Sequence, residues 1–176
     1  STCSWNRSQQ YIYNNFERVS RLNDHCLSGN SFIFHGGNAE ETTKSVDSMY
    51  FKKKSDGGAV MSVADGCGHP YDAQSVLNLE TATARATEYS SRLLAKYDNA
   101  EEILTDINNI IETIDTMIRD TTNGEEQTTL STIRAFNNND GTFQLVGFAV
   151  GDSTIGVINP ENGEFTKISS EGRTGD

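Results

Sequence analysis

The sequence predicts an α+β fold in which antiparallel β-sheets pack against a pair of helices. Three observations predict it. A hairpin pattern occupies residues 46–64, two helical patterns follow between residues 70 and 119, and strand patterns return from residue 128 onward. Because strands and helices come in groups and do not alternate singly, we expect segregated layers, as in α+β domains.

The N-terminal region is polar. We expect residues 1–30 to form an extension or a short helix ahead of a domain that spans residues 31–176. Loosely spaced apolar residues favour the helix over residues 8–24. A short strand pattern follows at Ser31–His35 and ends at a pair of glycines.

Two apolar segments flank a turn signal in the next part of the chain. Val46–Phe51 and Ala59–Ala64 are rich in the β-branched and aromatic residues that strands favour. The Ser-Asp-Gly-Gly sequence at residues 55–58 favours a tight turn. We therefore predict an antiparallel β-hairpin over residues 46–64.

The middle of the chain contains two helical patterns. Pro70–Ala95 has a helical composition, with apolar residues early and late in the segment. In Asn99–Arg119, isoleucine, leucine and methionine recur at steps of three and four residues, which gathers them on one stripe of a helix. Such a stripe is typical of a helix that packs on a core, so we expect this helix to cover a sheet.

Four strand patterns fill the last third of the chain. They span residues 128–136, 142–150, 154–158 and 164–168, and turns rich in asparagine and glycine separate them. Short strands in succession, joined by such turns, predict an antiparallel meander.

The composition argues against several classes of partner. The 176 residues include 25 acidic and 14 basic ones, for a net charge of -11. This charge disfavours nucleic acids and anionic membranes as partners. No segment approaches the ~20 apolar residues that a membrane span needs. The three cysteines and three histidines lack zinc-ligand spacing, and the cysteine usage favours a reducing, cytoplasmic location.

Three aspartates lie at the ends of predicted strands. Asp47 begins one hairpin strand and Asp65 follows its partner, so the register brings both to the same edge of the sheet. Asp152 lies between a glycine and a serine at a later strand break. Close carboxylates are unfavourable without a cation, and oxygen ligands suit magnesium or manganese. These acids therefore predict a metal site; the alternative is that each one stabilises its own turn.

Several segments resemble motifs of the metal-dependent protein phosphatases, known as the PPM or type 2C family. The first two motifs of that family resemble Ser45–Phe51 and Val60–Gly68. Its later motifs are similar to Thr128–Leu130, Asp140–Val146 and Ala149–Thr154. The motifs occur in the family's order, with a helix pair between the two blocks. The resemblance covers roughly residues 31–170 and implies one half of the αββα sandwich of the family.

The resemblance implies a chemistry for the acids. Asp47 and Asp65 would bind the two catalytic Mg²⁺ or Mn²⁺ ions, with the Gly66 carbonyl as a further ligand, and Asp152 would help to hold a third ion. The family hydrolyses phosphoserine and phosphothreonine in phosphoproteins through a metal-activated water. A phosphoprotein substrate is therefore the implied partner.

The chain departs from the family pattern at several places, including Val46, His69 and Thr154 within the motifs. Thr42 occupies the position of an arginine that grips substrate phosphate, which leaves Lys44 as the candidate phosphate contact, with charge but no bidentate fork. The two further metal aspartates of the family's C-terminal half have no counterpart before Asp176, so we expect the chain to correspond to the N-terminal half. Two other hypotheses stay open: a pseudophosphatase that binds or regulates protein partners, and a plain acidic interaction domain.

Overall fold

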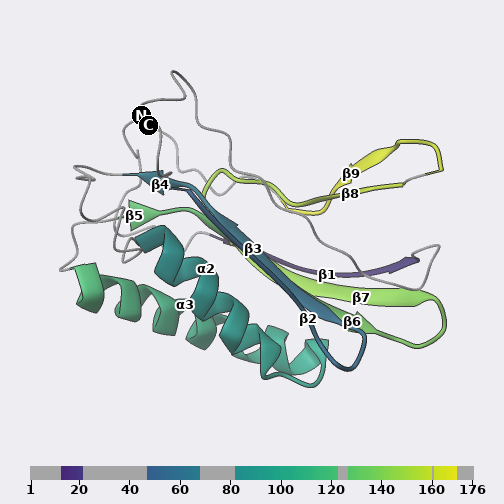
Figure 1. Cartoon of the computed structure of the whole chain (residues 1–176), viewed down its shortest axis with the longest axis horizontal. Coiled ribbons are helices and arrows are strands. Elements are labelled where there is room, and N and C mark those ends of the chain that lie inside the picture. Colours follow the sequence, from purple (N-terminus) through teal and green to yellow (C-terminus); the bar gives the residue numbers. More distant parts are fainter. Residues whose placement is uncertain (1–12, 22–46, 68–81, 123–126, 160, 170–176) are drawn as a thin grey trace.

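The computed structural model describes residues 13–21, 47–67, 82–122, 127–159 and 161–169. The predicted α+β class is confirmed. A five-stranded antiparallel sheet is covered on one face by two helices, and two small two-stranded sheets accompany it (Figure 1).

The main sheet is built from strands that are distant in the sequence. Its strand order is β1-β7-β6-β3-β2, so the pairing of β3 with β6 spans the helical insert. The described elements are β1 (Tyr13–Arg21), β2 (Ser48–Lys53), β3 (Ala59–Ala64), β4 (Gly66–Cys67), α2 (Ala82–Ala95), α3 (Ala100–Thr122), β5 (Gln127–Thr128), β6 (Leu130–Asn137), β7 (Thr142–Val150), β8 (Gly156–Ile158) and β9 (Phe165–Lys167).

The predicted hairpin is confirmed as β2 and β3. The turn between them closes where the Lys54 amide donates to the Gly58 carbonyl at 2.8 Å. The Asp56 carboxylate accepts from the Gly58 amide, also at 2.8 Å. Gly57 has a φ of 86°, a backbone conformation that favours glycine. The sequence Ser-Asp-Gly-Gly thus supplies both the side-chain acceptor and the glycine that this turn requires.

Both helical patterns are confirmed in the described residues. The first is confirmed from residue 82 onward as α2, and residues 70–81 lie outside the described part. The second is α3, which begins after Asn99, where the side chain of Asn99 accepts from the Glu102 amide at 2.9 Å. No helix in the described residues combines the length and the apolar character that crossing a membrane requires.

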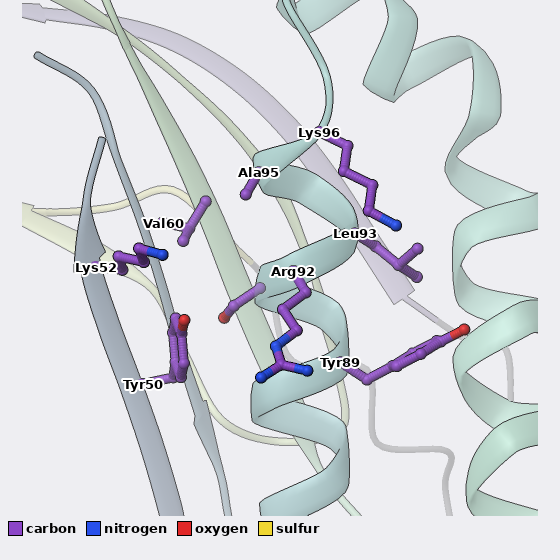
Figure 2. Close-up of a pocket in the computed structure, with 9 residues that line it drawn as sticks. Tyr50, Lys52, Val60, Tyr89, Arg92, Leu93, Ala95 and Lys96 are labelled. Atoms are coloured by element: carbon purple, nitrogen blue, oxygen red, sulfur yellow. The ribbon is translucent and has the colours of Figure 1, made fainter. Parts of the chain in front are cut away.

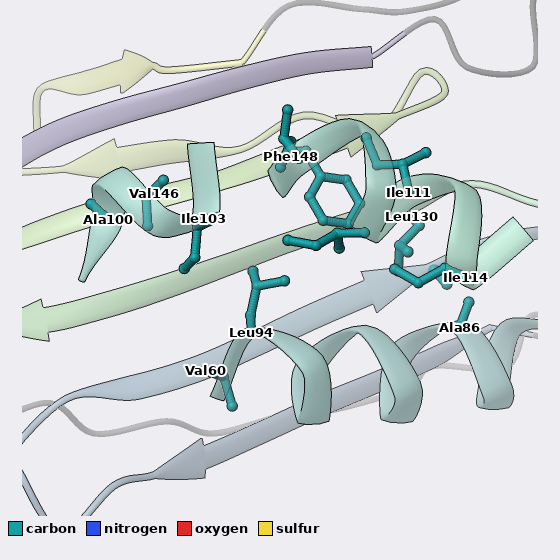
Figure 3. Close-up of a cluster of buried hydrophobic side chains, with 13 residues drawn as sticks. Val60, Ala86, Leu94, Ala100, Ile103, Ile111, Ile114, Leu130, Val146 and Phe148 are labelled. Carbon is teal, nitrogen blue, oxygen red and sulfur yellow. The ribbon is translucent and has the colours of Figure 1, made fainter. Parts of the chain in front are cut away.

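The main core lies between the two helices and the sheet (Figure 3). The apolar stripe of α3 supplies six of the buried side chains, five isoleucines and one alanine, as the pattern predicts. Strands β3, β6 and β7 supply the facing residues. The buried members are Val60, Ala64, Ala86, Leu94, Ala100, Ile103, Ile107, Ile110, Ile111, Ile114, Leu130, Val146 and Phe148.

Buried hydroxyl groups join α2 to the sheet. The Ser62 hydroxyl donates to the Thr87 carbonyl at 3.0 Å, and Ser90 hydrogen-bonds with Thr132 at 2.9 Å. At the start of β2, Ser48 hydrogen-bonds with the Thr87 hydroxyl at 2.9 Å. Small side chains allow a close approach of the helix, and each of these bonds satisfies a polar group that would otherwise be costly to bury. They fix α2 against the hairpin that carries Asp47 and Asp65.

The predicted N-terminal helix is wrong where the structure describes it. Tyr13–Arg21 forms strand β1, which pairs with the full length of β7. Phe16, Val19 and Leu22 recur every three residues, which favoured a helix. The open edge of β7 offers a complete row of backbone partners, and this tertiary pairing overrides so weak a local pattern. The boundary at residue 30 stays a prediction, and the expected strand at Ser31–His35 lies outside the described residues.

The predicted four-strand meander is only partly correct. β6 and β7 pair as expected, but β8 and β9 form a separate two-stranded sheet. Two features explain the break. Strand β1 already occupies the other edge of β7, and Gly151, with a φ of 107°, turns the chain away from the sheet after β7. The first predicted strand is also divided, because residues 127–128 pair with β4 and not with the main sheet.

Candidate metal centre

Asp47 and Asp65 lie side by side at one end of the hairpin, as its register predicts. The last residue pair of β2 and β3 is Ser48 with Ala64, and the two aspartates are the next residues outward. Burial and the neighbouring Asp47 carboxyl group raise the pKa of Asp65 above its ordinary value. Two carboxylates at one end of the hairpin repel each other, and a cation between them would relieve this repulsion.

Asp152 belongs to the same electrostatic group. Partial burial, the Asp47 carboxyl group and the charge of Asp152 all raise the pKa of Asp65. Asp152 reaches this position from the turn after β7, in a different part of the chain. Both of the other predicted aspartates therefore act electrostatically on Asp65.

Thr129 links the backbone of Asp65 to the turn that carries Asp152. Its hydroxyl accepts from the Asp65 amide at 2.9 Å, and its own amide donates to the Asp65 carbonyl at 3.0 Å. The same hydroxyl lies 3.3 Å from that of Ser153, the neighbour of Asp152. Thr129 is only 4% exposed. The sequence signal for Thr129 was its position in the phosphatase-like segment Thr128–Leu130, but that segment alone did not predict a role for the residue.

Of the two remaining predicted site residues, the structure describes Gly66 but not Lys44. Gly66 belongs to β4 and pairs with Thr128 of β5, which fixes the backbone directly after Asp65 (Figure 1). Lys44 lies outside the described residues, so its contact with phosphate stays a prediction. Within the described part of the chain, no three histidine, cysteine or acidic side chains converge tightly enough to form a finished metal centre.

This arrangement is suited to a hard divalent cation. Carboxylate oxygens are the ligands that magnesium and manganese prefer, and a cation would relieve the repulsion that raises the pKa of Asp65. Comparison of the chain with family models, curated proteins and solved structures finds no significant match. The phosphatase resemblance therefore depends on the motifs and on the positions of their residues.

Without metal, we expect Asp65→Asn to stabilise the protein increasingly as the pH rises. The folded state raises the pKa of Asp65, so the stability that its protonated form contributes is present below the unfolded value of about 3.9 and is lost as the pH rises through the folded value. Asparagine does not ionise and avoids this loss. Thermal melts in EDTA, from about pH 4 to about pH 7, measure the difference in Tm.

A charge-matched control separates this local effect from the overall negative charge. Glu112→Gln removes one exposed acid from α3, away from the hairpin. We expect Asp65→Asn to gain more than Glu112→Gln at neutral pH. Equal gains in the two variants would contradict a local repulsion at Asp65.

Proposed function

We propose that this protein is a Mg²⁺- or Mn²⁺-dependent phosphatase that hydrolyses phosphoserine and phosphothreonine in proteins. The observation that carries the proposal is the position of Asp47 beside Asp65, with Asp152 near enough to raise the pKa of Asp65. The order of the phosphatase-like motifs supports it, because the three aspartates come from three of those motifs.

The residues present fit the cations that this function requires. Asp47 and Asp65 supply paired carboxylates, Asp152 supplies a third, and the excess of negative charge around Asp65 favours replacement of a proton by a cation. When bound, such ions supply a water of lowered pKa and positive charge beside the phosphoryl oxygens. Thr129 holds the backbone of Asp65, and through Ser153 the turn of Asp152, so that the carboxylates keep their places.

A regulatory pseudophosphatase is the second candidate function. Thr42 stands where the family carries its phosphate-gripping arginine, so this chain lacks a planar group for bidentate contact at that position. In this alternative the aspartates still bind a cation, but the protein recognises a partner without hydrolysing it.

The test is phosphate release by the full-length gene product from a phosphothreonine peptide. We expect release in Mn²⁺ or Mg²⁺ and none in EDTA, because the carboxylates alone provide no nucleophile of sufficient strength. Cation binding without phosphate release would favour the pseudophosphatase. Release that persists in EDTA would contradict the proposal.

A further inference from the structure

A pocket lies toward the turn end of the hairpin, away from Asp47 and Asp65. It has a volume of about 410 Å³ and opens between β2, the last strand of the main sheet, and the C-terminal half of α2. Tyr50 and Lys52 of β2, Tyr89 and Arg92 of α2, and Lys96, which follows that helix, are among the residues that line it. Figure 2 shows Tyr50 and Lys52 on the β2 side of α2, and Tyr89 and Lys96 projecting from the opposite side of the helix. Pockets of this volume commonly accommodate small molecules or single recognition groups of a larger ligand.

The lining of the pocket is positively charged on a strongly acidic protein. Lys52, Arg92 and Lys96 line it, and no carboxylate does, although the chain carries a net charge of -11. In the described part of the chain neither lysine has an ion-pair partner. Arg92 contacts Glu88 at 2.6 Å through one nitrogen, which leaves other donors of its guanidinium group free for a ligand.

The folded state does not need these cations to cap α2. The last carbonyls of a helix carry partial negative charge, which a nearby lysine offsets. Lys54 already serves this purpose, because its ammonium group donates to the Ala95 carbonyl at 2.7 Å. Lys52, Arg92 and Lys96 are therefore not required as the cap of the helix end.

The pocket is separate from the candidate metal centre. Lys52 follows Asp47 by five residues in an extended segment, which separates their Cα atoms by about 17 Å. No aspartate of the metal centre lines the pocket. Occupation of the pocket therefore needs no divalent cation.

We propose that this pocket binds a phosphoryl group, carried by a phosphopeptide or by a small phosphorylated compound. Arg92 offers the planar fork that suits phosphate oxygens, and Lys52 and Lys96 add positive charge to the lining of the pocket. The rings of Tyr50 and Tyr89 supply apolar walls with hydroxyl groups for the part of the ligand that carries the phosphate. This site does not depend on the proposed phosphatase activity.

Amide chemical shifts of the full chain, titrated in EDTA, test the proposal. Pyrophosphate and a phosphoserine peptide are titrated separately up to about 10 mM in sulfate-free buffer. Addition of buffer alone is the control. We expect saturable shifts at residues 50–52 and 91–96. Arg92→Gln and Lys52→Gln should each weaken binding about tenfold, whereas Lys167→Gln, which removes an exposed charge from β9, should leave it unchanged.

The outcomes separate the two sources of the phosphoryl group. Tighter binding of the peptide assigns the pocket to a phosphorylated protein, and tighter binding of pyrophosphate assigns it to a small phosphorylated compound. Absence of saturable shifts with both probes overturns the proposal, as does an equal loss in Lys167→Gln and Arg92→Gln. Since metal is absent throughout, neither result depends on the phosphatase proposal.

Discussion

Under the proposed function, Asp65→Asn is expected to abolish both stabilisation by Mn²⁺ and Mn²⁺-dependent phosphate release. A ligand that binds only the folded state at 100 times its Kd adds about 2.7 kcal/mol, which corresponds to a rise in Tm of about 5 to 10 °C for a chain of this size. Asparagine preserves the side-chain volume but removes the charge. We expect Asp65→Asn to show no rise in Tm and a loss of activity of about 100-fold or more.

Two further variants make this test specific. Thr129→Val keeps the shape of a buried side chain but removes the hydroxyl that accepts from the Asp65 amide, so we expect cation affinity to fall about 10- to 100-fold. Glu112→Gln removes an exposed acid from α3 and should respond to Mn²⁺ as the wild type does. A rise in Tm that survives in Asp65→Asn would rule out the assigned centre.

The hairpin and its paired acids could be predicted because they depend on local information. Two apolar segments and a glycine-rich turn define the register, and the register alone places Asp47 beside Asp65. The position of Asp152 was harder to predict, since it depends on how the turn after β7 lies against β3. Its motif suggested the association, and its effect on the pKa of Asp65 agrees with that suggestion.

Strand β1 and Thr129 could not be predicted in the same way. β1 pairs with residues more than 100 positions later, and its own sequence carries no clear alternation that would favour a strand. Thr129 acts through a strand break, where the chain leaves β5, bonds to Asp65 and then enters β6. Neither a distant pairing nor an interruption of a strand is encoded in a local hydrophobic pattern.

Arg134 is the largest fully buried side chain in the described residues, and the sequence analysis did not predict its burial. It lies in β6 among β-branched and apolar residues and is 1% exposed, with its guanidinium 4.1 Å from the centre of the Phe136 ring. Its Nη1 donates to the Ala135 carbonyl, and its Nη2 lies 3.3 Å from the carboxylate of Asp56 in the β2–β3 turn. Its Nε has no partner in the described residues. Asp56, which is half-exposed, is thus the acid that contacts this buried charge, and the charge of Asp98 adds a smaller effect.

Asp56→Asn is expected to destabilise the protein by about 2 kcal/mol, because it leaves the Arg134 charge buried without its counter-ion. Asparagine retains an oxygen that can accept from the Gly58 amide, so the turn itself is preserved. Arg134→Met should cost less, since methionine fills the apolar site and leaves Asp56 solvated. Asp140→Asn, which retains the acceptor for the Thr142 amide in the β6–β7 turn, is the matched control and should change stability by less than about 0.5 kcal/mol.

The pH dependence of this loss identifies its cause. Burial alone would raise the pKa of Asp56, but the Gly58 amide and the Arg134 guanidinium outweigh it and lower the pKa below its ordinary value. The stability that Asp56 contributes is therefore present above its unfolded pKa of about 3.9 and is lost as the pH falls through the lower folded value. Urea unfolding should show wild type and Asp56→Asn converging in acid and separating toward neutral pH. A difference that stays constant with pH would mean that Asp56 acts only by shaping the turn, whereas convergence in acid, absent from Asp140→Asn, assigns the effect to its charge on Arg134.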